Sequence, residues 1–284
     1  MFDSVVIAWW LFWAFFGACL GSFAGAIIYR FQNGISIVHP RSFCGHCKKN
    51  LKIWHVIPIF SWLILCGRCS YCKQPIGIRL LVLELVGALA TLALWVHFGP
   101  SYAFFERVCF YFLLVCLSYI DLDSFFLPTS LLLALLLLAV CSLMIYAAYP
   151  ALYVGIAQET SLFRFMVLPT TSLFSLSDRL LGGVFGLLSL STINIVATGM
   201  LRFFRRLDKH QWAMGFGDAF LFMALGLFVG LSHSFLVLFL ASFLGSLAGI
   251  MMKMRPSIKY QDIPSGAIPF GPFLALAALY VYCS

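Results

Sequence analysis

Long apolar runs alternate with short polar segments along the chain. The runs fall at roughly 4–29, 80–98, 102–120, 125–148, 177–200, 213–231, 233–252 and 268–283. Several approach the ~20 residues that an α-helix needs to cross a bilayer, and they lack the strict alternation of membrane β-strands. The pattern predicts an all-α polytopic membrane protein with about eight transmembrane helices. A bundle of seven helices remains an alternative, because the expected turns at 99–101 and 230–232 are short and are the least certain boundaries between runs.

Composition agrees with a membrane protein. The 284 residues are 63% hydrophobic and 10% charged, whereas soluble domains carry about 25% charged residues. A soluble globule, a disordered chain and a small disulfide scaffold are therefore excluded. The first run is too long and too rich in tryptophan for a cleaved signal peptide, so we expect residues 1–29 to form a retained transmembrane helix.

The positive charges indicate an orientation. Residues 30–79, 201–212 and 253–267 hold 15 of the 18 lysines and arginines, and eight alternating spans place all three segments on one side. Because lysine and arginine mark the cytoplasmic side, we expect the N-terminus in the periplasm and residues 149–176 as the main outer loop. The formal net charge of +8 is then a topology signal. Anionic lipid headgroups, and not nucleic acid, are the expected partners of these charges.

Residues 30–79 contain two Cys-x-x-Cys pairs about twenty positions apart, Cys44/Cys47 and Cys69/Cys72. This spacing is typical of a structural zinc site with four thiolate ligands. Disulfides or a redox pair are the alternatives, but the cytoplasm keeps thiols reduced. We therefore expect residues 30–79 to form a cytoplasmic zinc domain. Other potential ligands in this segment are His39, His46, His55 and Cys66.

Two aspartates lie at the ends of apolar runs on the expected cytoplasmic side. Asp121 ends the third run, and Asp218 opens the sixth within Gly-Phe-Gly-Asp. Acidic residues in membrane segments are costly and invite a functional hypothesis. If the two carboxyl groups meet, they match the two-carboxylate arrangement of aspartic proteases. Helix capping is the alternative for Asp218, and we interpret Asp123 as a capping or solvated neighbour.

Three further acidic positions are less specific. Glu84, one turn into the second run, is expected to pair with Arg79 or Arg30 or to line a polar pocket. The pairs Glu106–Arg107 and Asp178–Arg179 are interpreted as interfacial charges at the opposite face. The chain has no His-Glu-x-x-His motif and no Gly-x-Ser-x-Gly motif, which excludes two common kinds of hydrolase site.

The order of the motifs resembles that of the type IV prepilin peptidases. The similar segments are Gly21–Arg30, Pro40–Cys47, Ile57–Trp62, Gly67–Cys72, Arg79–Glu84, Asp121–Pro128, Gly215–Asp218 and Ile268–Pro272. The chain departs from the family pattern at two positions. Gly25 stands where the family often has asparagine, and Phe220 stands where it often has lysine.

The resemblance implies a bifunctional enzyme of the bacterial inner membrane. Such an enzyme cleaves the basic leader of type IV prepilins and type II secretion pseudopilins at the cytoplasmic face. It then methylates the new N-terminal residue with S-adenosylmethionine. By motif match, Asp121 and Asp218 are the protease pair within a transmembrane protease bundle over residues 80–284. The departure at Gly25 bears on methylation, and no sequence feature locates the methyl-donor site.

Other functions stay open from the residues alone. A proton-coupled transporter with a cytoplasmic zinc domain would use the aspartates as proton-linked ligands, and inverted repeats would accompany it. No clear repeat is present. A non-catalytic assembly scaffold and a methyltransferase without protease activity are the remaining alternatives.

Overall fold

The computed structural model describes residues 2–39, 41–149, 175–204, 215–254 and 269–283. Within these residues the secondary structure is helical apart from two isolated β-bridges. The expected outer loop at 149–176 and most of the basic segments 201–212 and 253–267 lie outside the described residues. The elements in chain order are α1 (Phe2–Gln32), η1 (Ile53–His55), α2 (Phe60–Ile64), α3 (Ile78–Phe98), α4 (Tyr102–Ser124), α5 (Thr129–Ala148), α7 (Leu176–Phe203), α8 (Phe216–Met254) and α9 (Gly271–Cys283).

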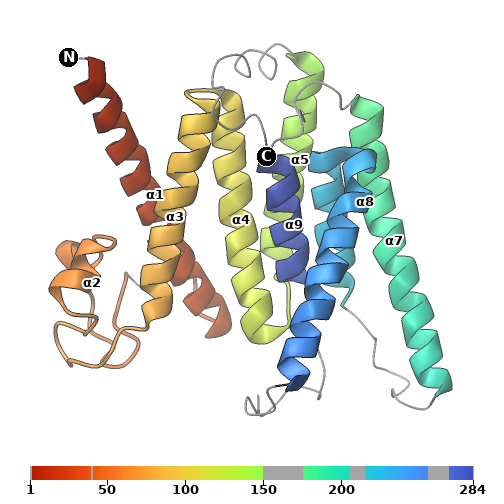
Figure 1. Ribbon diagram of the computed structural model, residues 1–284. Helices are drawn as coiled ribbons and strands as arrows, with labels where there is room; N and C mark the ends of the chain where they lie inside the picture. The colour runs from red at the N-terminus through yellow and green to blue at the C-terminus, as the bar shows by residue number, and fades with distance from the viewer. Residues whose placement is uncertain (1, 40, 150–174, 205–214, 255–268, 284) are drawn as a thin grey trace. The chain divides into compact units, whose positions relative to one another are not determined.

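Six of the described helices are long and apolar enough to cross a membrane: α1, α3, α4, α5, α7 and α8. This confirms the prediction of a polytopic helical membrane protein. Two of the eight predicted runs fall within α8, whose two helical arms meet at Gly230 with φ 74° and ψ 172°. Only glycine adopts this conformation readily, and the ribbon in Figure 1 reverses direction there. The last predicted run corresponds to α9, a shorter apolar helix.

The chain divides into two compact units, residues 1–116 and 117–284. In the first unit α1 packs closely on α3. A methyl group added to Gly17 would collide with the backbone carbonyl of Gly87, and one added to Gly21 would collide with that of Leu83. Small residues at helix–helix contacts let backbones approach in a membrane, where no hydrophobic driving force holds helices together.

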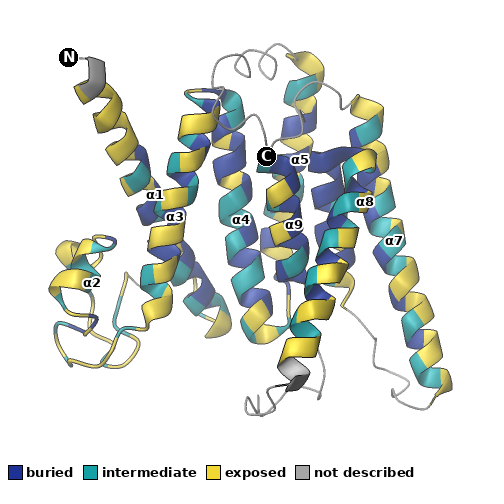
Figure 2. Cartoon of the chain, in the orientation of Figure 1, coloured by how far each residue is buried: buried dark blue, intermediate teal, exposed yellow. Residues whose placement is uncertain are grey.

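In the second unit α7 packs on α8 by the same device. Gly182 and Gly186 of α7 face the backbone of α8 so closely that an added methyl group would collide with it. Helix α8 also contacts α5 and α9. Figure 2 shows buried and exposed positions side by side along most of the helices, and many exposed positions are apolar, such as Leu137 of α5 and Leu188 of α7, as expected for helices that face both protein and lipid.

Two pairs predicted as interfacial charges are largely buried, so that interpretation is wrong. The side chains of Glu106, Arg107 and Arg179 are 1%, 5% and 4% exposed. Arg179 donates from Nε to the Leu227 carbonyl and from Nη2 to Ser142 Oγ, both at 2.9 Å. These bonds satisfy the guanidinium inside the bundle, which makes its burial tolerable. Asp178, the acid beside Arg179, is partly exposed.

Candidate active site and metal centre

The four predicted cysteine ligands come together. The Sγ atoms of Cys44, Cys47, Cys69 and Cys72 all lie within 4.8 Å of one another, and those of Cys44 and Cys72 are 3.8 Å apart. A tetrahedral site with Zn–S bonds near 2.3 Å has sulfurs about 3.8 Å apart. The donor set and its spacing therefore fit a tetrahedral metal ion. Cys66, the spare thiol, is exposed and outside this cluster.

Each Cys-x-x-Cys pair lies in a knuckle of the same construction. The first is closed by a bridge between Phe43 and Asn50, and the second by a bridge between Arg68 and Pro75. In both knuckles the lysine after the second cysteine has positive φ, 57° in the first and 59° in the second. Its N–H donates to the carbonyl of the first cysteine at 2.9 and 3.0 Å. Local backbone bonds thus aim both sulfurs of each pair in one direction.

Backbone donors also act on the thiol chemistry. The N–H of Cys72 donates to the sulfur of Cys69, and together with the other hydrogen bonds of the cluster it lowers the pKa of the Cys69 thiol to about 6. Desolvation and the hydrogen bonds with the other three thiols raise the pKa of Cys72 to about 11, so Cys69 is the first of the two to become the thiolate, which is the form that binds metal.

The two predicted catalytic aspartates are both buried within the second unit. Asp121, near the end of α4, is 5% exposed, and Asp218, in the first turn of α8, is 9% exposed. The negative charge of Asp121 acts on Asp218, so the two carboxyl groups lie within electrostatic range. Two acids separated by 97 positions in the sequence are thus brought near one another by α4 and α8.

The surroundings of the two carboxyl groups differ. Oδ2 of Asp121 accepts the backbone N–H of Gly271, at the start of α9, at 3.1 Å. A methyl group added to Gly271 would lie 2.6 Å from the same oxygen. Oδ1 of Asp218 is buried and has no hydrogen-bond partner among the described residues. One acid is therefore fixed by a backbone donor, and the other carries a buried oxygen with unused hydrogen-bonding capacity.

Gly271 is the contact that the sequence did not identify as part of this site. It belongs to the segment Ile268–Pro272, whose sequence resembles the family pattern. Gly217, the second glycine of Gly-Phe-Gly-Asp, has a comparable packing role, because a methyl group added to it would lie 3.1 Å from Leu127 Cβ. Both glycines keep neighbouring segments close to the aspartates.

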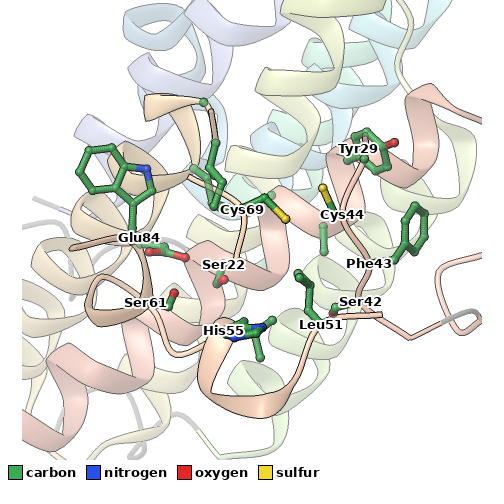
Figure 3. A pocket seen from close by; sticks show the side chains of 18 of the residues that line it. Ser22, Tyr29, Ser42, Phe43, Cys44, Leu51, His55, Ser61, Cys69 and Glu84 are labelled. Atoms are coloured by element: carbon green, nitrogen blue, oxygen red, sulfur yellow. The ribbon is translucent and has the colours of Figure 1, made fainter. Parts of the chain in front are cut away.

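Glu84 lines a cavity of about 630 Å³ in the first unit. Its Oε2 accepts the N–H of Ile59 at 2.7 Å, and its carboxyl group also shares a hydrogen bond with Ser22. Of the two roles considered for it, the structure supports that of a pocket-lining acid. Figure 3 shows Glu84 and Ser22 in the cavity together with Cys44 and Cys69 of the metal centre.

Taken together, the fold and the sites define a multi-pass helical membrane protein with a four-thiolate centre in one unit and two buried acids in the other. Residues 15–98 match the bacterial peptidase A24 N-terminal domain, and residues 108–250 match the type IV leader peptidase family. The chain belongs to the type IV leader peptidase family.

Several similar proteins carry the same name. Proteins named prepilin leader peptidase/N-methyltransferase occur in Myxococcus xanthus, 31% identical over 259 residues, which cover 89% of this chain and 68% of that protein. Those of Aeromonas hydrophila (31%, with 85% and 71% covered) and Pseudomonas aeruginosa (32%, with 87% and 72% covered) are similar. No solved structure matches the chain significantly.

Proposed function

We propose that this protein is a prepilin leader peptidase and N-methyltransferase. It removes the leader from type IV prepilins and type II secretion pseudopilins and then methylates the new N-terminal amine. The observation that carries the proposal is the juxtaposition of Asp121 and Asp218, both buried, in a member of the type IV leader peptidase family. A buried pair of carboxyl groups is the arrangement that aspartic proteases use.

The different surroundings of the two acids suggest their roles. Asp121, which holds the Gly271 N–H, acts as the carboxylate that takes a proton from water. The oxygen of that water bonds to the scissile carbonyl carbon, while Asp218 donates a proton to the carbonyl oxygen. Collapse of the tetrahedral intermediate breaks the C–N bond. The amine takes the proton that Asp121 gained from water, and one hydroxyl of the intermediate returns a proton to Asp218 as the carboxyl group forms. Asp218 suits the donor role because its Oδ1 has no hydrogen-bond partner among the described residues.

Methylation follows on the amine that cleavage releases. The amine nitrogen forms a bond to the methyl carbon of S-adenosylmethionine, the carbon–sulfur bond breaks, and the sulfonium becomes a neutral thioether. The proton lost by the amine goes to water. An amide nitrogen is a poor nucleophile, so the chemistry itself requires that cleavage comes first.

The metal centre and the location complete the proposal. Zn²⁺ is the ion that four thiolates at this spacing select, and Cys44, Cys47, Cys69 and Cys72 would hold it. With four protein ligands it would stabilise a segment that has little core of its own. The positive charges of residues 30–79 support a location of this segment on the cytoplasmic side of the inner membrane, with the N-terminus in the periplasm.

The test is the N-terminus of a co-expressed prepilin, read by mass spectrometry. Wild type should yield pilin without its leader and with one added methyl group. Asp121→Asn and Asp218→Asn should each leave the leader attached, because each removes one half of the proton transfer. Asp123→Asn is the matched control, because it changes an acid two positions from Asp121 on the same helix. Processing of the prepilin by both Asp121→Asn and Asp218→Asn would refute the acid pair.

A further inference from the structure

The cavity that Glu84 lines lies entirely in the first unit, whereas the aspartate pair lies in the second. Its volume of about 630 Å³ is within the roughly 300–1,000 Å³ of small-molecule sites. Its walls come from α1, α3 and the segment between them that carries the metal centre. The acids of the second unit do not line it, so the leader-cleavage chemistry gives this cavity no role.

The cavity combines one buried negative charge with positive charges. The acid is Glu84, which is 3% exposed, and the positive charges are Arg79 and Arg30, whose Nη1 also donates to the carbonyls of Ser36 and Ile37. The two known partners of Glu84 are the Ile59 N–H and Ser22. A carboxylate accepts about four hydrogen bonds, so Glu84 has capacity left for a ligand. A ligand with a cationic centre and a carboxylate of its own would complement this arrangement.

Aromatic and hydrogen-bonding groups supply the rest of a site. Phe23, Tyr29 and Trp62 line the cavity and offer faces for a flat ring or a cation. Two buried ring nitrogens, Nε1 of Trp62 and Nδ1 of His55, have no hydrogen-bond partner in the part of the chain that the structure describes. Such orphaned polar atoms call for an explanation, and a bound heterocycle with donors and acceptors provides one.

We propose that this cavity is the site of the methyl donor, S-adenosylmethionine, and that Glu84 is the buried counter-charge for its sulfonium. The inference rests on the proposed function and deepens it. The sulfonium cation of the donor would face the Glu84 carboxylate. Its amino acid carboxylate would face the guanidinium groups, and its purine would lie against the aromatic walls. Cys44 and Cys69 of the metal centre line the same cavity.

Gly25 lies on the wall of the same cavity. A methyl group added there would lie 2.6 Å from Leu80 Cδ1, so any larger residue at this position would have to displace Leu80. The departure of this chain from the family pattern therefore falls on the proposed donor site. In this chain Leu80 fills the space that the asparagine side chain of the family pattern would take.

The test is direct binding of S-adenosylmethionine to the purified full-length protein, measured by equilibrium dialysis. Wild type should bind saturably. Glu84→Gln should weaken S-adenosylmethionine at least 10-fold but weaken S-adenosylhomocysteine much less, because the thioether has no positive charge for Glu84 to recognise. The matched control is Glu106→Gln, another buried glutamate of the first unit that does not line the cavity. It should bind both compounds as wild type does.

A second measurement does not depend on a variant. Photochemical crosslinking of labelled S-adenosylmethionine to the wild-type protein, followed by peptide mapping, should label residues within 19–84, the span of the cavity lining. Label confined to 117–284, or unchanged selectivity between the two compounds in Glu84→Gln, would overturn the site. A wild-type protein that methylates cleaved pilin while giving either result would leave the proposed function intact and refute only the location.

Discussion

The most demanding prediction concerns Gly271, because a single added methyl group should move a proposed catalytic oxygen. In Gly271→Ala the new Cβ would lie 2.6 Å from Asp121 Oδ2. Ordinary contacts of non-bonded heavy atoms begin near about 3.4 Å, so the carboxylate must retreat by roughly 0.8 Å. The glycine has no positive φ, so the backbone itself accepts alanine. The perturbation is therefore confined to the acid.

A displacement of about 1 Å in a catalytic group costs on the order of 100-fold in rate. For roughly 0.8 Å we expect kcat/KM for prepilin cleavage to fall about 10- to 100-fold, which is about 1.4 to 2.7 kcal/mol of transition-state stabilisation. The assay is leader cleavage of purified prepilin by the detergent-solubilised protein under single-turnover conditions. Methylation of a synthetic pilin peptide with a free N-terminus should keep its wild-type rate, because the change lies in the second unit.

Gly245→Ala is the matched control for Gly271→Ala. Gly245 lies in α8 of the same unit, and its added methyl group would come no nearer than 3.5 Å to a neighbouring atom. It should cleave at the wild-type rate. If Gly271→Ala also cleaves at that rate and unfolds at the wild-type temperature, Asp121 does not act from the position that the structure gives it, and the proposed proton transfer is wrong.

Two further predictions concern the metal centre and the helix packing. Cys69→Ser should lose the bound metal, as measured by elemental analysis of the purified protein, and should make residues 41–77 more sensitive to protease. Cys66→Ser, which changes an exposed cysteine outside the cluster, should retain the metal. Equal metal content in the two variants would contradict the four-cysteine site. Gly226→Ala should lower the midpoint of thermal unfolding by several degrees, because its methyl group would collide with the Gly182 backbone. The control is Gly199→Ala, whose methyl group meets no described atom within 4 Å. It should leave the midpoint unchanged.

The helices and the metal centre could be predicted because their signals are local. A membrane requires each span to be long and apolar, so α3 and α5 stand out by hydropathy alone. Each Cys-x-x-Cys pair is set by bonds within a few residues, as the Lys48 N–H to Cys44 carbonyl bond illustrates. The turn at Gly230 was expected from the length of the apolar stretch, and the dihedral angles supply its physical cause.

Burial of charged side chains could not be predicted in the same way. Arg179 was interpreted as an interfacial charge because of its place at the end of an apolar run. Its acceptors are a carbonyl 48 positions away and a hydroxyl 37 positions away, and no sequence pattern joins these positions. The same reason hid the Gly271 contact, which lies 150 positions from Asp121. Partners of this kind exist only after the bundle has formed.

The two proposed chemistries differ in what they require of the fold, and the sites proposed for them lie in different units. Hydrolysis by the proposed mechanism needs two acids close together, and α4 and α8 bring Asp121 and Asp218 together from distant positions in the sequence. Methyl transfer needs a cavity large enough for a cofactor-sized ligand. Such a cavity arises where the thiolate-closed segment covers α1 and α3. If this cavity binds the methyl donor, the metal centre shapes one of its walls through Cys44 and Cys69, so an intact centre is expected to matter more for methyl-donor binding than for the acid pair.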